Sequence, residues 1–83
     1  MVIPEYPYRA LTRGIEGEVI VEYSLDELGK VIEAEIVSAE PSTIFNRHVL
    51  KAIRSSTFNP RKIDGKPVPA EDLVEKYVFV LES

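Results

Sequence analysis

The sequence predicts a two-layer α+β domain in which two helices pack on one face of a three-stranded, antiparallel-type sheet. Three stretches alternate apolar and polar residues with a period of two, two stretches follow a helical period, and turn residues separate them. A chain of 83 residues has room for only one hydrophobic core. We therefore expect a single domain over residues 1–83.

The first predicted element is a short helix from Pro7 to Arg13. Proline suits the first turn of a helix because the N–H that it lacks would have no partner there. Gly14 follows the helix and readily adopts the left-handed conformation in which many helices end. These signals predict a helix of about two turns.

The next two elements are strands that form an antiparallel hairpin. The first runs from Glu18 to Leu25 and the second from Lys30 to Ser38. The turn between them is Asp26–Gly29, in which we expect Gly29 to have a positive φ. One face of the second strand is expected to carry Ile32, Ala34 and Ile36.

A second helix is predicted after Pro41, with Ser42 or Thr43 as its cap. Four apolar residues fall at i, i+4, i+7 and i+8, which places them on one helix face: Phe45, Val49, Ala52 and Ile53. The opposite face carries Asn46, Arg47, Lys51 and Arg54. The helical period ends at Ser55-Ser56. Turn residues from Asn59 to Pro67 then predict a loop or a small hairpin, with Asp64-Gly65 as the strongest signal.

The third long strand is predicted from Leu73 to Leu81, which is rich in Val, Tyr, Phe and Leu. A strand that follows a helical crossover returns parallel to the strand before it, with a right-handed connection. The third strand can then pair with the first, which gives the strand order two, one, three. The alternative order one, two, three also leaves the third strand at an edge of the sheet.

This third strand is apolar on both faces near its end, because Val74, Val78 and Val80 alternate with Tyr77, Phe79 and Leu81. Only Glu75 and Lys76 interrupt it. A long apolar edge strand is normally covered by other elements or meant to pair with another chain. The residues alone leave both interpretations open.

Composition and motifs argue against several classes of function. A net charge of -4 disfavours nucleic acid and anionic lipid surfaces, and the lack of cysteine removes disulfides and thiolate metal sites. His48, the only histidine, has no nearby cysteine or ordered carboxylate pair, so we interpret it as a surface or boundary residue of the second helix. The glycines are spread as caps and turns and form no phosphate-binding loop. We therefore predict no catalytic residues, no metal and no cofactor.

Two groups of charged residues remain. The acidic side chains are mostly the solvent-facing partners of the predicted strands, since paired carboxylates need a cleft to catalyse. Arg61, Lys62 and Lys66 form a small basic loop, which is usually a solvated rim and only occasionally a docking patch.

Several segments, in this order and spacing, resemble the C-terminal domain of the TonB family, periplasmic energy-coupling proteins of Gram-negative bacteria. They are Tyr6-Pro7, Arg13-Gly14-Ile15-Glu16-Gly17, Asp26 to Gly29, Val37-Ser38-Ala39, Phe45 and Phe58-Asn59-Pro60. The resemblance covers nearly the whole chain. It implies a full-length protein with an N-terminal membrane anchor and a Pro-rich spacer, neither of which is in these 83 residues.

In that family the last strand accepts an extended segment of outer-membrane transporters, the TonB box, by strand addition, and the Tyr-Pro segment lies beside it. The resemblance therefore implies partner-binding residues in two segments: Leu73, Val74, Glu75, Lys76, Tyr77, Val78, Phe79 and Val80, together with Ile3, Pro4, Glu5, Tyr6 and Pro7. Well-known members have Gln where this chain has Ile3, so we expect backbone or apolar contact there. Phe58 is retained without the Trp that often precedes it.

The resemblance implies a periplasmic domain of an inner-membrane-anchored protein that transmits proton-motive-force-derived energy. The implied cargo is an iron–siderophore, haem or vitamin-type ligand, and ExbB and ExbD would be engaged through the missing regions. One alternative is a TolA-like C-terminal interaction domain, although those domains usually carry a disulfide and this chain has no cysteine. A small α+β enzyme is the other alternative, and no assembled acid, base or nucleophile supports it.

Overall fold

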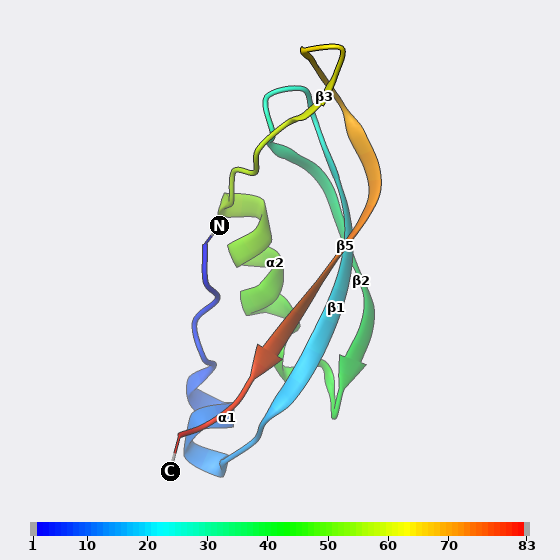
Figure 1. Cartoon of the computed structure of the whole chain (residues 1–83). Coiled ribbons are helices and arrows are strands. Elements are labelled where there is room, and N and C mark those ends of the chain that lie inside the picture. Colours follow the sequence, from blue (N-terminus) through cyan, green and yellow to red (C-terminus); the bar gives the residue numbers. More distant parts are fainter. Residues whose placement is uncertain (1, 83) are drawn as a thin grey trace.

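The structure, a computed structural model, describes residues 2–82 and has two layers, with helices on one side of a twisted antiparallel sheet (Figure 1). The sheet has the strand order β2-β1-β5, and a separate two-stranded sheet joins β3 and β4. The elements are α1 (Tyr8–Arg13), β1 (Gly17–Leu25), β2 (Val31–Glu40), the 3-10 helix η1 (Thr43–Phe45), α2 (Asn46–Ser55), β3 (Arg61–Ile63), β4 (Lys66–Val68) and β5 (Ala70–Phe79). The predicted order two, one, three is confirmed, with β5 as the third long strand. Within the described residues, no helix is long and apolar enough to cross a membrane.

Helix α1 ends at Arg13 as predicted, but it begins at Tyr8, one residue later than predicted. Pro7 stands just outside it as the N-cap, and its carbonyl oxygen accepts a hydrogen bond from the Leu11 N–H at 2.9 Å. Gly14 ends the helix with a φ of 66° and donates its N–H to the Leu11 carbonyl. The helix lies on the same side of the sheet as α2, beyond its lower end (Figure 1).

The turn between β1 and β2 is held by Asp26, whose Oδ1 accepts the N–H groups of Leu28 and Lys30, both at 2.9 Å. Gly29 has a φ of 84°, as the sequence predicts. A side chain would also not fit there, because a Cβ on Gly29 would lie 1.9 Å from the Phe58 carbonyl oxygen. The turn is therefore packed against the segment that follows α2.

The register of β2 corrects one prediction. Ala34 and Ile36 pair with Tyr23 and Val21 and are half-buried, as expected, but Ile32 is 60% exposed. The register shifts between Val31 and Glu33, so Ile32 is an extra residue in a bulge and leaves the inner face. A strict alternation cannot predict such an insertion, because one extra residue turns the following side chains to the other face.

The second helix begins with η1, in which the Ser42 Oγ accepts the Ile44 N–H at 3.3 Å. The predicted inner face is confirmed, since all four of its apolar residues are buried: Phe45, Val49, Ala52 and Ile53. Phe45, Val49 and Ile53 belong to one hydrophobic core with the inner face of β1 and β5, which contributes Val19, Val21, Tyr23, Leu25, Ala70, Tyr77 and Phe79. This single core lies between the two layers.

The segment predicted as a loop or small hairpin is the β3–β4 hairpin. Its central residues, Asp64 and Gly65, both have positive φ, as in a type I′ turn. The hairpin projects beyond the end of the three-stranded sheet (Figure 1). It helps to give the molecule its elongated shape, with extents of 49 × 21 × 17 Å.

Strand β5 begins earlier than predicted, at Ala70 instead of Leu73, and ends at Phe79 instead of Leu81. Ala70 pairs with Leu25 across an irregularity in which Asp72 adopts a φ of 57°. From Leu73 to Phe79 the pairing with β1 is regular. The apolar part of β5 therefore pairs with β1 in a regular register, without a bulge.

Candidate functional site

Strand β5 is an edge strand, because within residues 2–82 it pairs in the sheet with β1 alone. The other edge, β2, is irregular, with bulges at Ile32 and Val37 and exposed carboxylates on Glu33, Glu35 and Glu40. Bulges and charges are the usual means by which proteins prevent an edge from pairing with another chain. Only the β5 edge combines a regular ladder with an apolar surface.

The direction of the backbone groups along β5 follows from its neighbours. The Asp26 N–H donates to the Lys30 carbonyl oxygen. The backbone N–H and C=O groups of the even-numbered residues of β1 therefore point toward β2, and those of the odd-numbered residues point toward β5. In β5, the residues opposite those odd-numbered residues, such as Tyr77 opposite Val19, therefore point their backbone N–H and C=O groups toward β1. The N–H groups that point to the free edge belong to Val74, Lys76, Val78 and Val80.

A hydrogen bond just after the end of β5 agrees with this alternation of backbone groups. The Leu81 N–H turns back toward the start of β1 and donates to Glu16 Oε2 at 2.7 Å. No local signal in the sequence marks this contact between residues 65 positions apart.

The N-terminal segment lies beside β5 and is held there by contacts with the core. Val2 donates its N–H to the buried Ser56 Oγ at 2.8 Å. The Tyr6 ring stands edge-on to Phe45 and Phe79, with ring centroids 5.8 and 5.5 Å apart, and its hydroxyl donates to the Ile15 carbonyl. Tyr6 thereby joins the N-terminal segment directly to β5.

A groove of about 310 Å³ runs between these two segments, and we call it the edge groove. Its lining residues all belong to the set that the sequence predicts: Ile3, Pro4, Tyr6, Lys76, Tyr77, Val78, Phe79 and Val80. The remaining predicted residues lie outside it. Glu5 and Pro7 line other hollows, and Leu73, Val74 and Glu75 lie further back along β5. Val74, Val78 and Val80 are about 60% exposed on the open face of the sheet.

Tyr77 is the polar residue on the inner side of this groove. Its hydroxyl is buried and has no hydrogen-bond partner within residues 2–82. Burial, and to a smaller extent the charge of Glu75 and the neighbouring Tyr23, raises the pKa of Tyr77 to about 12. The side chain therefore remains neutral throughout the physiological range.

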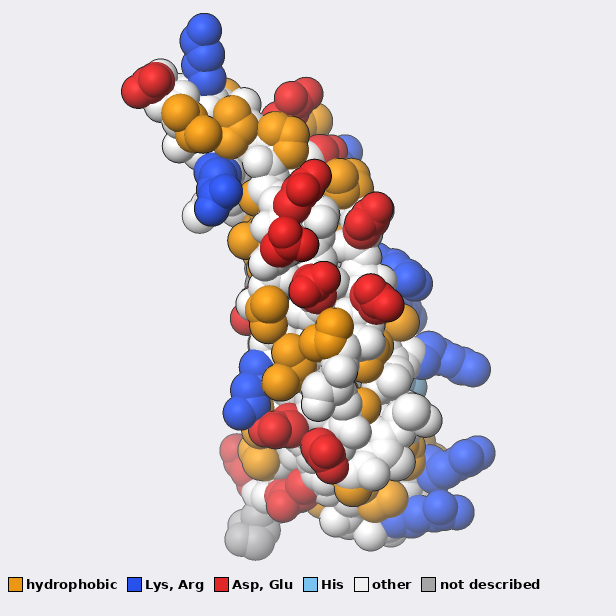
Figure 2. Space-filling view, turned by 90° about the vertical axis from the view of Figure 1, so that its right-hand side faces the viewer, with side chains coloured by type: hydrophobic (Ala, Val, Ile, Leu, Met, Phe, Trp, Pro, Cys, Tyr) orange, Lys and Arg blue, Asp and Glu red, His pale blue; other side chains and the backbone are white. Residues whose placement is uncertain are grey.

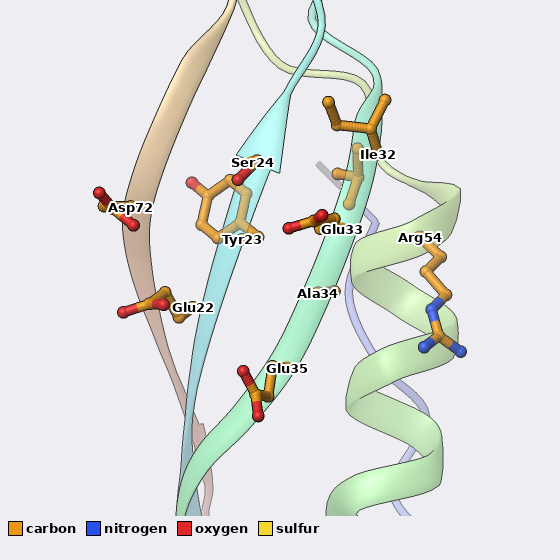
Figure 3. Close-up of a pocket in the computed structure, with 10 residues that line it drawn as sticks. Glu22, Tyr23, Ser24, Ile32, Glu33, Ala34, Glu35, Arg54 and Asp72 are labelled. Carbon is orange, nitrogen blue, oxygen red and sulfur yellow. The ribbon is translucent and has the colours of Figure 1, made fainter.

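A larger hollow lies elsewhere, on the sheet near the β1–β2 turn, with a volume of about 730 Å³ (Figure 3). Figure 3 shows carboxylates from three strands around this hollow, on Glu22, Glu33, Glu35 and Asp72. Arg54 lies beside β2, on α2. In the described part of the chain, no three His, Cys, Asp or Glu side chains are placed to hold a metal ion. We therefore assign this hollow no chemistry.

His48 is half-buried on α2, as expected of a boundary residue. It lines two shallow hollows on the helix side and is not part of the edge groove. Glu5 and Ser55 line one of these hollows with it, but the Ser55 hydroxyl donates to the Lys51 carbonyl at 2.8 Å and not to His48. The geometry of the edge groove supports pairing with an extended chain instead.

Comparisons with known proteins agree with this geometry. The family described as Gram-negative bacterial TonB protein C-terminal matches residues 3–81. The chain belongs to this TonB C-terminal family. The match decides between the two interaction families considered above, and TonB proteins are energy-transducing and not enzymes.

Two TonB relatives illustrate the likeness. The TonB protein of Yersinia enterocolitica is 40% identical over 76 residues, which are 92% of this chain and 27% of the relative. The TonB protein of Pseudomonas aeruginosa is 34% identical over 80 residues, which are 96% of this chain and 23% of the relative. The chain thus spans about a quarter of the length of these relatives.

A solved TonB structure shares the fold. The solution structure of the Pseudomonas aeruginosa TonB C-terminal domain superposes with a TM-score of 0.82 at 32% identity. The superposition covers 96% of this chain and 80% of the other. The two-layer α+β fold is therefore that of TonB C-terminal domains.

Proposed function

We propose that this domain binds the TonB box of outer-membrane transporters by strand addition to the free edge of β5. The observation that carries the proposal is the contrast between the two sheet edges. Edge β2 is bulged and acidic, whereas β5 is regular from Leu73 to Phe79 and borders a groove. A peptide added there would pair with the outward groups of Lys76, Val78 and Val80. Its inward side chains would contact Ile3 and Tyr6.

In the full-length protein the domain would lie in the periplasm, with an inner-membrane anchor upstream. It would transmit energy derived from the proton-motive force, through contacts of ExbB and ExbD with other regions, to the uptake of iron–siderophore, haem or vitamin-type ligands. Membership of the TonB family supports this part of the proposal.

Titration of the labelled domain with a TonB-box peptide tests the binding site. Backbone amide shifts are expected to cluster at 73–80 and 3–7. Shifts that map to β2 would show that the edge assignment is wrong. A peptide N-methylated at alternate residues is the matched control, because it keeps the side chains and loses the backbone donors. Equal binding of the two peptides would contradict strand addition.

A further inference from the structure

One carboxylate of this domain binds a distant part of the backbone. Figure 2 shows acidic side chains spread over the open face of the sheet. Within residues 2–82, only two carboxylates accept a hydrogen bond from a backbone N–H, those of Asp26 and Glu16. Asp26 accepts from Leu28 and Lys30 inside one turn, whereas Glu16 accepts from Leu81, 65 positions away. Glu16 therefore joins the start of β1 to the residues that follow β5.

The pairing between β5 and β1 ends at Phe79. One step further in this register Leu81 would lie opposite Ile15, but both backbone groups of Ile15 are bonded elsewhere. The Ile15 N–H donates to the Ala10 carbonyl oxygen at 2.9 Å, and the Ile15 carbonyl oxygen accepts the Tyr6 hydroxyl. The chain before β1 thus turns toward α1 and the N-terminal segment, and it does not continue the ladder.

The Glu16 side chain supplies the acceptor that the ladder lacks at this point. Its Oε2 lies 2.7 Å from the Leu81 nitrogen, a distance typical of a hydrogen bond to a charged acceptor. Such bonds are roughly twice as strong as those between neutral groups. The carboxylate therefore takes the role of a backbone carbonyl of β1 and holds the chain one step beyond Phe79.

This contact sets the direction of the residue before it. Because the Leu81 N–H points toward the start of β1, the N–H and C=O of Val80 point to the free edge. Val80 is exposed and lines the edge groove. In the described chain, the bond to Glu16 is the only hydrogen bond made by residues 80–82. The orientation of Val80 thus depends on Glu16.

We propose that Glu16 is a positioning residue for strand addition, because its hold on Leu81 makes Val80 present its backbone groups to the added peptide. This inference rests on the proposed function and deepens it, since it concerns one end of the same edge. An added strand pairs with every second residue of β5, here Lys76, Val78 and Val80. Glu16 thereby determines whether the partner pairs with all three residues or with the first two.

Glu16 also lies close to the opposite wall of the edge groove, which the N-terminal segment forms. Burial, and to a smaller extent the charge of Glu16, raises the pKa of Tyr6. The Tyr6 hydroxyl therefore stays protonated and donates to the Ile15 carbonyl. The same carboxylate thus stands near both walls of the groove, beside Tyr6 on one side and the end of β5 on the other.

Peptides of two lengths test the role of Glu16 in the isotope-labelled domain. A TonB-box peptide is shortened by two residues from either end, and the form that no longer shifts the Val80 amide of the wild type serves as the short peptide. Glu16→Ala is expected to weaken binding of the full peptide roughly three- to tenfold, since the two backbone bonds to Val80 are lost. Binding of the short peptide is expected to change by less than about twofold, because its bonds remain.

Two outcomes of this titration would overturn the proposal. Equal losses for the two peptides would mean that Glu16 supports only the fold. A Val80 amide that shifts with neither or with both shortened peptides would mean that pairing does not end at this residue. Because the Glu16 side chain is exposed, its substitution is expected to leave the fold intact, and native amide shifts in β1 check this.

Two conservative variants separate the hydrogen bond from the charge. Glu16→Gln keeps the length of the side chain and an acceptor oxygen, so it is expected to keep most of the affinity for the full peptide. Glu16→Asp keeps the charge but is too short to reach Leu81, so it is expected to behave like Glu16→Ala. The opposite order would overturn the proposal. Glu27→Ala removes an exposed carboxylate beyond the other end of β1 and is expected to change neither affinity.

Amide hydrogen exchange of the free domain tests the contact without any peptide. The Leu81 amide is expected to exchange severalfold faster in Glu16→Ala than in the wild type, while the amides of β1 keep their protection. Unchanged exchange of Leu81 would overturn the proposal even if the peptide binds. Failure of the wild type to bind any of the peptides would instead overturn strand addition, and with it the role of Glu16 in binding, while the contact with Leu81 would stand.

Discussion

At the scale of single residues, the hydroxyl of Tyr77 is a buried polar group without a hydrogen-bond partner in the described chain. A buried polar group without a partner costs about 1–3 kcal/mol. Tyr77→Phe removes this oxygen and keeps the ring, so we expect it to raise the free energy of unfolding by about 1 kcal/mol at neutral pH. Urea denaturation followed by circular dichroism measures the change. A clear loss of stability would show that the hydroxyl has a partner after all.

The same residue predicts a pH dependence. The pKa of Tyr77 rises from 10.0 to about 12 on folding, so the folded state keeps this proton when the unfolded state has lost it. The contribution of the protonated Tyr77 hydroxyl to stability is fully present below pH 10 and is lost as the pH rises through 12. The stability of the wild type is therefore expected to fall more steeply than that of Tyr77→Phe between about pH 10 and pH 12. Parallel curves would contradict the raised pKa.

Val78→Pro tests the direction of the backbone at the free edge. The Val78 N–H points away from β1, so proline removes a donor that only an added strand would use. We expect a folded domain with native amide shifts in β1 that no longer binds a TonB-box peptide. Tyr77→Pro is the contrasting variant, because its N–H faces β1, and it is expected to unfold the sheet edge. Binding by a folded Val78→Pro domain would exclude pairing at this residue.

At the scale of elements, two turn glycines with similar backbones differ in their surroundings. Gly29 and Gly65 have φ of 84° and 78°, but only at Gly29 would a Cβ meet backbone, 1.9 Å from the Phe58 carbonyl oxygen. Strained φ alone costs about 1–3 kcal/mol. We expect Gly65→Ala to cost about 1 kcal/mol and Gly29→Ala at least about 2 kcal/mol more, because the turn must separate from Phe58. Thermal denaturation compares them, and equal losses would mean that the Gly29–Phe58 contact adds nothing.

The elements were predictable where a local pattern determines them. The helical spacing of Phe45, Val49, Ala52 and Ile53 predicts the buried face of α2, and Asp64-Gly65 predicts the hairpin turn. The position of Ile32 was not predictable, because a bulge depends on pairing between strands. The start of β5 at Ala70 was missed for a similar reason: the left-handed Asp72 interrupts the pattern, and pairing with Leu25 restores the strand.

At the scale of the whole molecule, the sequence predicted that the last strand is an apolar edge, but not which part of it forms a groove. The groove covers only 76–80 because the N-terminal segment passes beside that part of β5. The path of this segment depends on the contact between Val2 and Ser56, 54 positions apart, and on the packing of Tyr6 against Phe79. No pattern within a short stretch of sequence contains that information.

The geometry of β5 also predicts a mechanical behaviour of the complex. Each backbone hydrogen bond contributes only about 0.5–1.5 kcal/mol net, so an added strand is expected to bind with modest affinity. Pulling along the strand axis loads all the added bonds together, whereas pulling across the sheet opens them one at a time. Single-molecule pulling on the domain–peptide complex should therefore give a higher rupture force along the strand than across it. Equal forces in both directions would remove the mechanical part of the proposed function and leave the binding part standing.

The β3–β4 hairpin has a practical consequence for work with this domain. Its base is fastened where Phe58 donates to the Gly29 carbonyl at 2.9 Å and where Lys30 pairs with Thr57. Its tip at Gly65 is open, with nothing within 4 Å of an added Cβ. We therefore expect the tip of the hairpin to tolerate insertions: a fluorophore, an affinity tag or a longer loop placed there would leave the core unchanged. Because β5 runs from this hairpin to the edge groove, such a label would report from the end of the molecule opposite the bound peptide.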